Sequence, residues 1–195
     1  MPETQKLGEK IPCLYFAEPG PVNTGPTLER AAERAADLDI RSVVVASTSG
    51  ATGLLAAKLF RGRNLVVVTH SAGFAKPDLQ EMPPEARTSL EEAGARVLTA
   101  QHALGGIGRA VRKKLGTYEI EEIMAFTLRT LGQGAKVAVE IALMAADAGL
   151  ISTQEPCLSL GGTDRGADTA LLLRPVNAQN FFDLKIMEII AKPRL

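Results

Sequence analysis

Short hydrophobic runs alternate along the chain with longer segments whose apolar residues recur at helical spacing. The β-branched run Val43–Val45 is typical of a strand that is buried on both faces. The Ala-rich segment Leu28–Leu38 predicts an amphipathic helix, and we expect Thr27 to cap it. The predicted strands are Ile11–Ala17, the run containing Val43–Val45, Asn64–Thr69, Arg96–Thr99, Pro156–Leu160, Ala170–Leu173 and an edge strand within Asn180–Leu195.

This order of elements predicts a three-layer α/β/α fold. We expect one domain over residues 1–195, because the chain is long enough for one core and too short for two comfortable domains. The sheet is expected to be mixed and mostly parallel, with about five strands, the usual number. Two more helices, Tyr118–Leu131 and Gly134–Ala148, are expected to cover one face of the sheet as a pair.

A polar loop interrupts the pattern where the Val43–Val45 strand ends and the next helix begins. Its residues are Ser47, Thr48, Ser49, Gly50, Ala51 and Thr52. The unpaired amides of a first helical turn favour an anion, and Gly50 lets the backbone approach one closely. The loop matches neither the Walker A motif nor the dinucleotide-binding motif G-x-G-x-x-G. The alternative is an ordinary turn in which Thr52 caps the helix.

Other polar residues are expected at the same edge of the sheet. Asn23 and Thr24 lie between a predicted strand and a helix, and Thr69 and His70 follow another strand. Ligands in open α/β sheets bind at this carboxyl edge. The titration range of histidine suits acid–base catalysis, although a lone histidine near a cleft is more often a hydrogen-bonding loop residue.

Two further segments carry candidate chemistry. Glu140 lies in a helix that is apolar on nearly every side, so we expect it to be buried and paired, with Arg165 as its cation. The alternative is that Glu140 is a catalytic residue. The turn before the basic helix, in Gln101–Leu115, is a weak match to a phosphate loop, with Arg109 nearby, and His102 is a second-rank candidate.

The segment SVVVASTSGATGLLAAKLFRGRNLVVVTH resembles the C-terminal domain of pyruvate kinase, and the later segments GQGAKVAVEIALMAADAGLI and GGTDRGADTALLLRPVNAQNFFD extend the resemblance. The whole chain resembles free-standing prokaryotic proteins with this domain alone. The resemblance implies the fold, a phosphate bound by Ser47–Thr52, and flavin mononucleotide (FMN) as ligand. It also implies that Gly161–Thr169 closes over the ligand. In that loop we expect contacts from Gly161, Gly162, Thr163, Arg165 and Gly166.

The chain also departs from pyruvate kinase. It has no Trp, and Ser47–Thr52 contains no Lys or Arg, so a singly phosphorylated ligand such as FMN is expected rather than a sugar bisphosphate. The first functional hypothesis is a binding protein for such a molecule. The second is a flavin-dependent or phosphometabolite-processing enzyme that uses His70, Glu140 and Arg165. The third is an interaction domain that binds no phosphate compound.

Composition excludes several other classes. The chain has 22 basic and 22 acidic residues and 4% aromatics, which argues against a nucleic-acid partner. We expect no signal peptide, no membrane span and a cytoplasmic location. Cys13 and Cys157 are expected to be reduced buried thiols, and no metal-ligand cluster is present. Phe181 and Phe182 are expected in the core or in a subunit contact, which leaves a homo-oligomer open.

Overall fold

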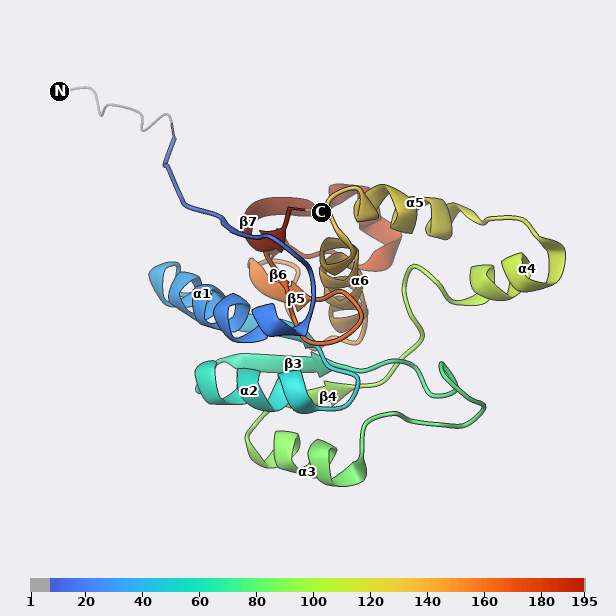
Figure 1. Ribbon diagram of the computed structural model, residues 1–195, viewed down its shortest axis with the longest axis horizontal. Helices are drawn as coiled ribbons and strands as arrows, with labels where there is room; N and C mark the ends of the chain where they lie inside the picture. Colours follow the sequence, from blue (N-terminus) through green and yellow to red (C-terminus); the bar gives the residue numbers. More distant parts are fainter. Residues whose placement is uncertain (1–7, 195) are drawn as a thin grey trace.

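The computed structural model describes residues 8–194. Most of the polar amino-terminal segment, for which we expect no signal peptide, therefore lies outside the described residues. The described chain forms one sheet of seven strands in the order β1-β7-β6-β5-β2-β3-β4 (Figure 1). The strands are β1 (Leu14–Phe16), β2 (Ser42–Ala46), β3 (Asn64–Val68), β4 (Arg96–Leu98), β5 (Cys157–Gly161), β6 (Thr169–Arg174) and β7 (Lys185–Pro193).

The pairing confirms a mixed, mostly parallel sheet. Neighbours pair in parallel except at the two edges of β6, which is antiparallel to both β5 and β7. All the other strands therefore end at the same edge of the sheet. The prediction of about five strands is wrong, because β7 joins the sheet beside β6 and β1 then pairs with β7.

The prediction that the last strand is an edge strand is also wrong. β7 lies between β1 and β6, and its Ala191 pairs with Leu14 on one side and Ala170 on the other. Ile190 and Ala191 are buried, which favours an interior position. Pro193 is tolerated because it is the last residue of the strand.

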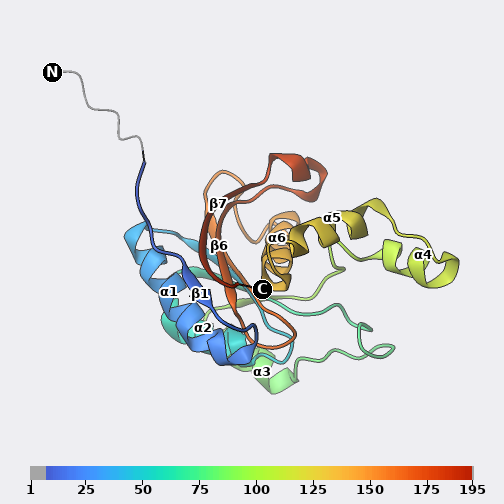
Figure 2. The same ribbon diagram turned by 45° about the horizontal axis from the view of Figure 1, so that its top comes forward.

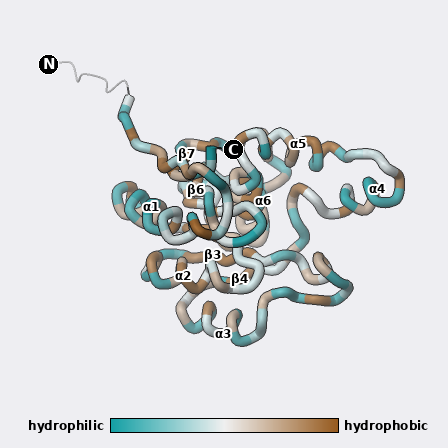
Figure 3. The backbone as a smooth tube through the Cα atoms, viewed as in Figure 1, coloured by the Kyte–Doolittle hydropathy of each residue, from teal (hydrophilic) through white to brown (hydrophobic). Residues whose placement is uncertain are grey.

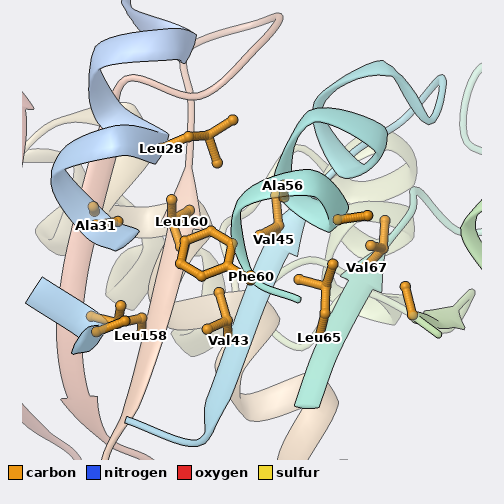
Figure 4. Close-up of a cluster of buried hydrophobic side chains, with 14 of the residues drawn as sticks. Leu28, Ala31, Val43, Val45, Ala56, Phe60, Leu65, Val67, Leu158 and Leu160 are labelled. Carbon is orange, nitrogen blue, oxygen red and sulfur yellow. The ribbon is translucent and has the colours of Figure 1, made fainter. Parts of the chain in front are cut away.

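Helices cover both faces of the sheet, as expected for three layers. They are α1 (Thr24–Asp37), α2 (Ala51–Leu59), α3 (Pro84–Glu92), α4 (Ile107–Leu115), α5 (Ile120–Arg129) and α6 (Gln133–Asp147), with 3-10 turns η1 (Pro21–Asn23) and η2 (Ala178–Asp183). Val43 and Val45 point to the α1–α2–α3 face, where they pack with Phe60 (Figure 4). Val44 points to the opposite face, against α6. β2 is thus buried on both faces, as its continuous β-branched run predicts.

Helix α1 begins earlier than predicted. It starts at Thr24, directly after η1, so Thr27 is a fully buried residue of the helix and not its cap. The sequence T-G-P-T permits this because Pro26 falls in the first helical turn, where its missing N–H has no helical partner to lose.

Helices α4 and α5 extend away from the sheet and form what we call the α4–α5 arm, residues 107–129 (Figure 2). Ile107 and Ile120 of the arm are strongly exposed. Hydrophobic and hydrophilic residues alternate along the arm (Figure 3). Helix α5 packs on α6, which in turn packs on the sheet. The predicted pairing of the two helices is therefore confirmed, but α6 covers the sheet and α5 lies on α6.

The remaining predictions about the chain can be compared with the described residues. Cys157 is fully buried in β5, and burial raises the pKa of its thiol to about 12. Cys13 is half-buried. Phe181 packs against the α6 side of the core, whereas Phe182 is largely exposed. No helix within residues 8–194 is both long enough and apolar enough to cross a bilayer.

Gly161 tests the packing between β5 and α6. A Cβ at this position would lie 2.8 Å from the backbone nitrogen of Ala138 and would also overlap the carbonyl oxygen of Gly134. We expect Gly161→Ala to lower the free energy of unfolding by about 1–3 kcal/mol in urea denaturation, because neither backbone atom can move away cheaply. The control is Gly25→Ala in α1, where a Cβ meets nothing within 4 Å. Equal stability of the two variants would contradict this packing.

Candidate functional site

The predicted site residues leave neighbouring strands at the carboxyl edge of the sheet. Past the end of β2, the Ser47 amide donates to the carbonyl of Val68, at 2.9 Å. Past the end of β3, the Thr69 amide donates to the carbonyl of Leu98, also at 2.9 Å. The loops after β2, β3 and β4 therefore start side by side, and the loop after β5 starts on the other side of β2.

The Ser47–Thr52 loop is held by two features. Gly50 has a left-handed φ of 91°, and a Cβ there would lie 2.8 Å from Cβ of Ala86 on α3, so only glycine fits without strain. The Ser47 hydroxyl accepts a hydrogen bond from the Gly53 amide at 3.1 Å. Ser47, not Thr52, thus binds a free amide of the first turn of α2.

The rest of this loop has unused hydrogen-bonding capacity. Within residues 8–194, the amides of Ala51 and Thr52 have no partner, and the hydroxyls of Thr48, Ser49 and Thr52 make no hydrogen bond. Thr48 is half-buried and Ser49 is exposed. The positive end of the α2 dipole and several donors therefore remain available for an oxyanion.

Thr69 and His70 are both held by other side chains. The buried Thr69 hydroxyl lies 2.8 Å from the Thr99 hydroxyl, at the end of β4. Nδ1 of His70 lies 2.8 Å from Oε2 of Glu81. The Glu81 carboxylate therefore fixes the orientation of the His70 ring, which is the usual second requirement for an acid–base histidine. Glu81 could not be found from the sequence, since it lies in a proline-containing loop without periodicity.

An aromatic cluster joins the two histidines. Phe74 stacks on His102 with ring centroids 5.0 Å apart and planes 9° apart, and its centroid lies 4.1 Å from that of His70. The centroids of His70 and His102 are 5.5 Å apart. His102, a second-rank candidate from the sequence, is thus beside His70 at this edge of the sheet.

Glu140 is buried and paired, as predicted, but its partner is not Arg165. Its Oε2 forms an ion pair with Nζ of Lys136, one turn earlier in α6, and its Oε1 accepts the Leu104 amide at 3.0 Å. Nδ1 of His102 lies 3.8 Å from Oε2. The i, i+4 spacing of Lys136 and Glu140 in an apolar helix was the signal that could have identified this pair.

Burial governs the charges of this cluster. Desolvation lowers the pKa of His102 to about 4, only partly opposed by the Glu140 carboxylate. Desolvation also lowers the pKa of Lys136, again against the attraction of Glu140. His102 is therefore neutral at physiological pH, when its Nε2 accepts a long hydrogen bond, 3.4 Å, from the Ser71 amide.

The Gly161–Thr169 loop is joined to the loop before α1 by a buried carboxylate. Asp168, fully buried, accepts the amides of Gly20 and Thr163, both at 3.1 Å, and the Thr169 hydroxyl at 2.9 Å. Three donors replace the water that this carboxylate loses. No sequence pattern marked Asp168, which the structure shows to be the centre of this junction.

Two predicted contact residues near this junction are bound to the protein itself. The Thr24 hydroxyl donates to the Pro21 carbonyl at 2.7 Å and accepts the Ala167 amide at 3.1 Å. The Asn23 side-chain amide donates to the Glu18 carbonyl at 2.8 Å. Both side chains stabilise the turn into α1.

The glycines of the Gly161–Thr169 loop permit close packing. Cβ atoms at Gly162 and Gly166 would meet backbone atoms of Ala167 and Pro21, at 3.1 and 2.8 Å respectively. Arg165 and its neighbour Asp164 are both exposed, and within residues 8–194 the Arg165 guanidinium has no hydrogen bond or ion pair. Arg165 is therefore the cationic side chain of this loop that is free to meet an anionic ligand.

Sequence comparison identifies the family. Residues 26–173, about three quarters of the chain, match the pyruvate kinase alpha/beta domain. The chain belongs to this family. The match runs from α1 to β6, so β1 and β7 of this pyruvate kinase alpha/beta domain protein lie outside it.

Solved pyruvate kinases are also similar to the chain, although loosely. Pyruvate kinase from Cryptosporidium parvum covers 80% of this chain at 14% identity and a TM-score of 0.40, and its complex with ADP covers 80% at 16% identity and the same TM-score. The chain spans only 23–24% of those proteins. The family assignment therefore rests on the sequence match.

The site contains no evident metal centre in the part of the chain that the structure describes, where no group of three or more His, Cys, Asp or Glu side chains is placed to hold an ion. Its chemistry is instead that of free amides, hydroxyls and a partly buried pair of histidines.

The two histidines give a direct test of the buried cluster. Because folding lowers the pKa of His102 from its usual 6.5 to about 4, the unfolded chain binds a proton between these values that the folded chain does not. We therefore expect the free energy of unfolding to fall as the pH decreases from about 6.5 to about 4. In histidine NMR titrations, the signal that persists in His70→Gln should titrate near pH 4.

His102→Gln provides the matched control for stability. It removes the titrating group, so part of the loss of stability between pH 6.5 and 4 should disappear. A His102 signal that titrates at or above pH 6 would contradict the claim that burial outweighs the attraction of the Glu140 carboxylate.

Proposed function

We propose that the protein binds a phosphorylated small molecule through the Ser47–Thr52 loop, with FMN as the best candidate. The observation that carries this proposal is the set of unused donors at the start of α2, namely the amides of Ala51 and Thr52 and the neighbouring hydroxyls. Amides aligned with a helix dipole bind phosphate without needing a cationic side chain. The resemblance to the effector loop of pyruvate kinase supports the same assignment.

The loop is also prepared for a ligand by its rigidity. The Gly53 amide is already bound to Ser47, and Gly50 is packed against Ala86, so the loop need not reorganise to present its remaining donors. Preorganised donors lose less entropy on binding than mobile ones. A phosphate group held here would bond to Thr48, Ala51 and Thr52.

The choice of FMN depends on what lies beside the loop. The next loop along the edge carries His70 and Phe74, whose rings, together with His102, form a half-exposed aromatic surface. Such a surface suits a flat heterocycle. On the other side of the Ser47–Thr52 loop lies the Gly161–Thr169 loop, which we propose covers the ligand. Its Arg165 has a free guanidinium for that contact.

A second candidate function is catalysis on a bound phosphorylated compound. The His70–Glu81 pair favours it, since a histidine oriented by a carboxylate could take or give a proton at its free nitrogen. Arg165 belongs to the loop after β5, on the far side of β2 from His70. Its role would therefore be to stabilise negative charge on the bound compound and not to transfer a proton.

Phosphate-dependent flavin binding tests the first proposal. We expect FMN to bind, riboflavin to bind about tenfold or more weakly, and Thr48→Val/Thr52→Val to weaken FMN by about tenfold, because hydrogen bonds to a charged phosphate are lost. Fluorescence titration of the purified protein gives all three affinities. The control is Thr153→Val, which lies before β5 at the opposite edge of the sheet.

Equal affinity for FMN and riboflavin would contradict phosphate recognition. The protein could instead bind another phosphate ester and not FMN, and lose that binding in Thr48→Val/Thr52→Val. This result would show that FMN is the wrong ligand and that the loop does bind phosphate.

His70→Gln separates binding from catalysis. A pure binding protein should keep its preference for FMN over riboflavin in His70→Gln, because the phosphate contacts are made elsewhere and loss of the ring weakens both flavins alike. If the FMN-loaded protein turns over a phosphorylated substrate, the same variant at saturating FMN should lose most of that rate. Unchanged turnover in His70→Gln would exclude His70 from the chemistry.

A further inference from the structure

A cleft of about 460 Å³ lies between Phe74, the α4–α5 arm and the start of α6. Its charged lining residues are Arg109, Arg112, Lys113, Glu122, Arg129 and Lys136. The chain as a whole has no net charge, so this concentration of cations is local and does not follow from a basic composition. None of these residues belongs to the Ser47–Thr52 loop.

Three arginines of the cleft are each placed over an aromatic ring. The guanidinium carbon of Arg109 lies 4.9 Å from the Phe74 centroid, and that of Arg129 lies 4.9 Å from the Phe126 centroid. Arg112 lies 5.6 Å from the centroid of Tyr118. Stacking restricts the plane of a guanidinium while leaving its N–H groups free in the plane.

The cations of the cleft are only partly neutralised by the protein. Lys136 is paired with Glu140, and Arg112 donates through Nε to Oε1 of Glu122, at 2.8 Å. In the described part of the chain, Arg129 donates only to the neutral side chain of Gln133, at 2.6 Å. Within residues 8–194, Arg109 has no carboxylate partner.

Glu122 leaves further donors of Arg112 unused. Residue Glu122 is 7% exposed, and within residues 8–194 its second carboxylate oxygen is buried without a hydrogen-bond partner. Because the pairing is made through Nε alone, both terminal nitrogens of Arg112 remain available. Three half-buried guanidiniums therefore present N–H groups to one cleft with one carboxylate between them.

Such an arrangement is unfavourable without an anion. Like charges that share a partly desolvated cleft repel each other, and an anion bound between them removes that repulsion. Planar guanidiniums match the oxygens of a phosphate bidentately. A phosphate group, with about two charges, balances the uncompensated Arg109 and Arg129 better than a single carboxylate.

We propose that this cleft is a second anion-binding site, which takes a small molecule carrying a phosphate group. Arg109 and Arg129 provide the main contacts, Arg112 the third, and Phe74 and Phe126 hold the guanidiniums in place. This site goes beyond the phosphate loop and does not depend on it, because no residue of Ser47–Thr52 lines the cleft, although the cleft shares Phe74 with the proposed flavin surface.

Pyrophosphate is the probe for this site. Isothermal titration at fixed ionic strength should show binding to the wild-type protein, weakened about tenfold or more in Arg109→Gln/Arg129→Gln, since each lost contact is a charge-assisted hydrogen bond. Arg109→Lys/Arg129→Lys, which keeps the charge but not the planar fork, should weaken binding to an intermediate extent. Circular dichroism verifies that each variant is folded.

Two controls make the result specific. Lys58→Gln/Arg61→Gln also removes two positive charges, but from exposed residues at and just after the end of α2. This variant should keep the pyrophosphate affinity within about twofold. Thr48→Val/Thr52→Val should also leave the pyrophosphate affinity of the cleft unchanged. Loss of binding in this loop variant with retention in Arg109→Gln/Arg129→Gln would overturn the cleft and support the loop alone.

Other outcomes also decide the question. No binding of pyrophosphate to the wild-type protein up to about 10 mM would overturn the proposal. Equal affinity for malonate and pyrophosphate would overturn the assignment to phosphate. If Lys58→Gln/Arg61→Gln weakened pyrophosphate binding as much as Arg109→Gln/Arg129→Gln does, the loss would reflect net charge and the cleft would be overturned. The loop's own FMN titration is unaffected by any of these results, so the two proposals can fail separately.

Discussion

Parallel strand pairing is the constraint on which the structure of this site depends. Because β6 alone runs against the others, β1, β5, β2, β3 and β4 all end at one edge of the sheet. The chain must turn there each time into a helix or a long loop, and each turn leaves backbone amides to be satisfied. Polar residues of the candidate site, such as Ser47, Thr69 and His70, come together at this edge for that reason.

Most of these polar groups form hydrogen bonds within the protein, so the groups without such partners are the candidates for ligand binding. Asp168 and Thr24 join two loops, Glu140 holds Lys136 and the Leu104 amide, and Ser47 binds the Gly53 amide. Buried groups without such partners would cost about 1–3 kcal/mol each. The donors at the start of α2 and the partly free guanidiniums that line the cleft are among the groups of the described residues whose hydrogen-bonding capacity is not filled.

Sequence patterns predicted the elements well and the contacts less well. Periodicity located β2, β3 and α6 because burial on one or both faces leaves a repeating signal. It misplaced β7 as an edge strand, because an alternating sequence is compatible with an edge or an interior position and the partner β1 is set only by tertiary pairing. The same reasoning found that Glu140 is buried but assigned it Arg165, since the nearer Lys136 was overlooked within the same helix. Asp168 and Glu81 lie in loops, where no period reports on burial.

The central claim is that the start of α2 holds the phosphate of a small molecule. The most direct measurement is a crystal structure of the protein grown with FMN. The account predicts phosphate density within hydrogen-bonding distance of the Ala51 and Thr52 amides and the Thr48 hydroxyl. Well-ordered FMN whose phosphate lies elsewhere, with these donors bound only to water or to the protein, would contradict it.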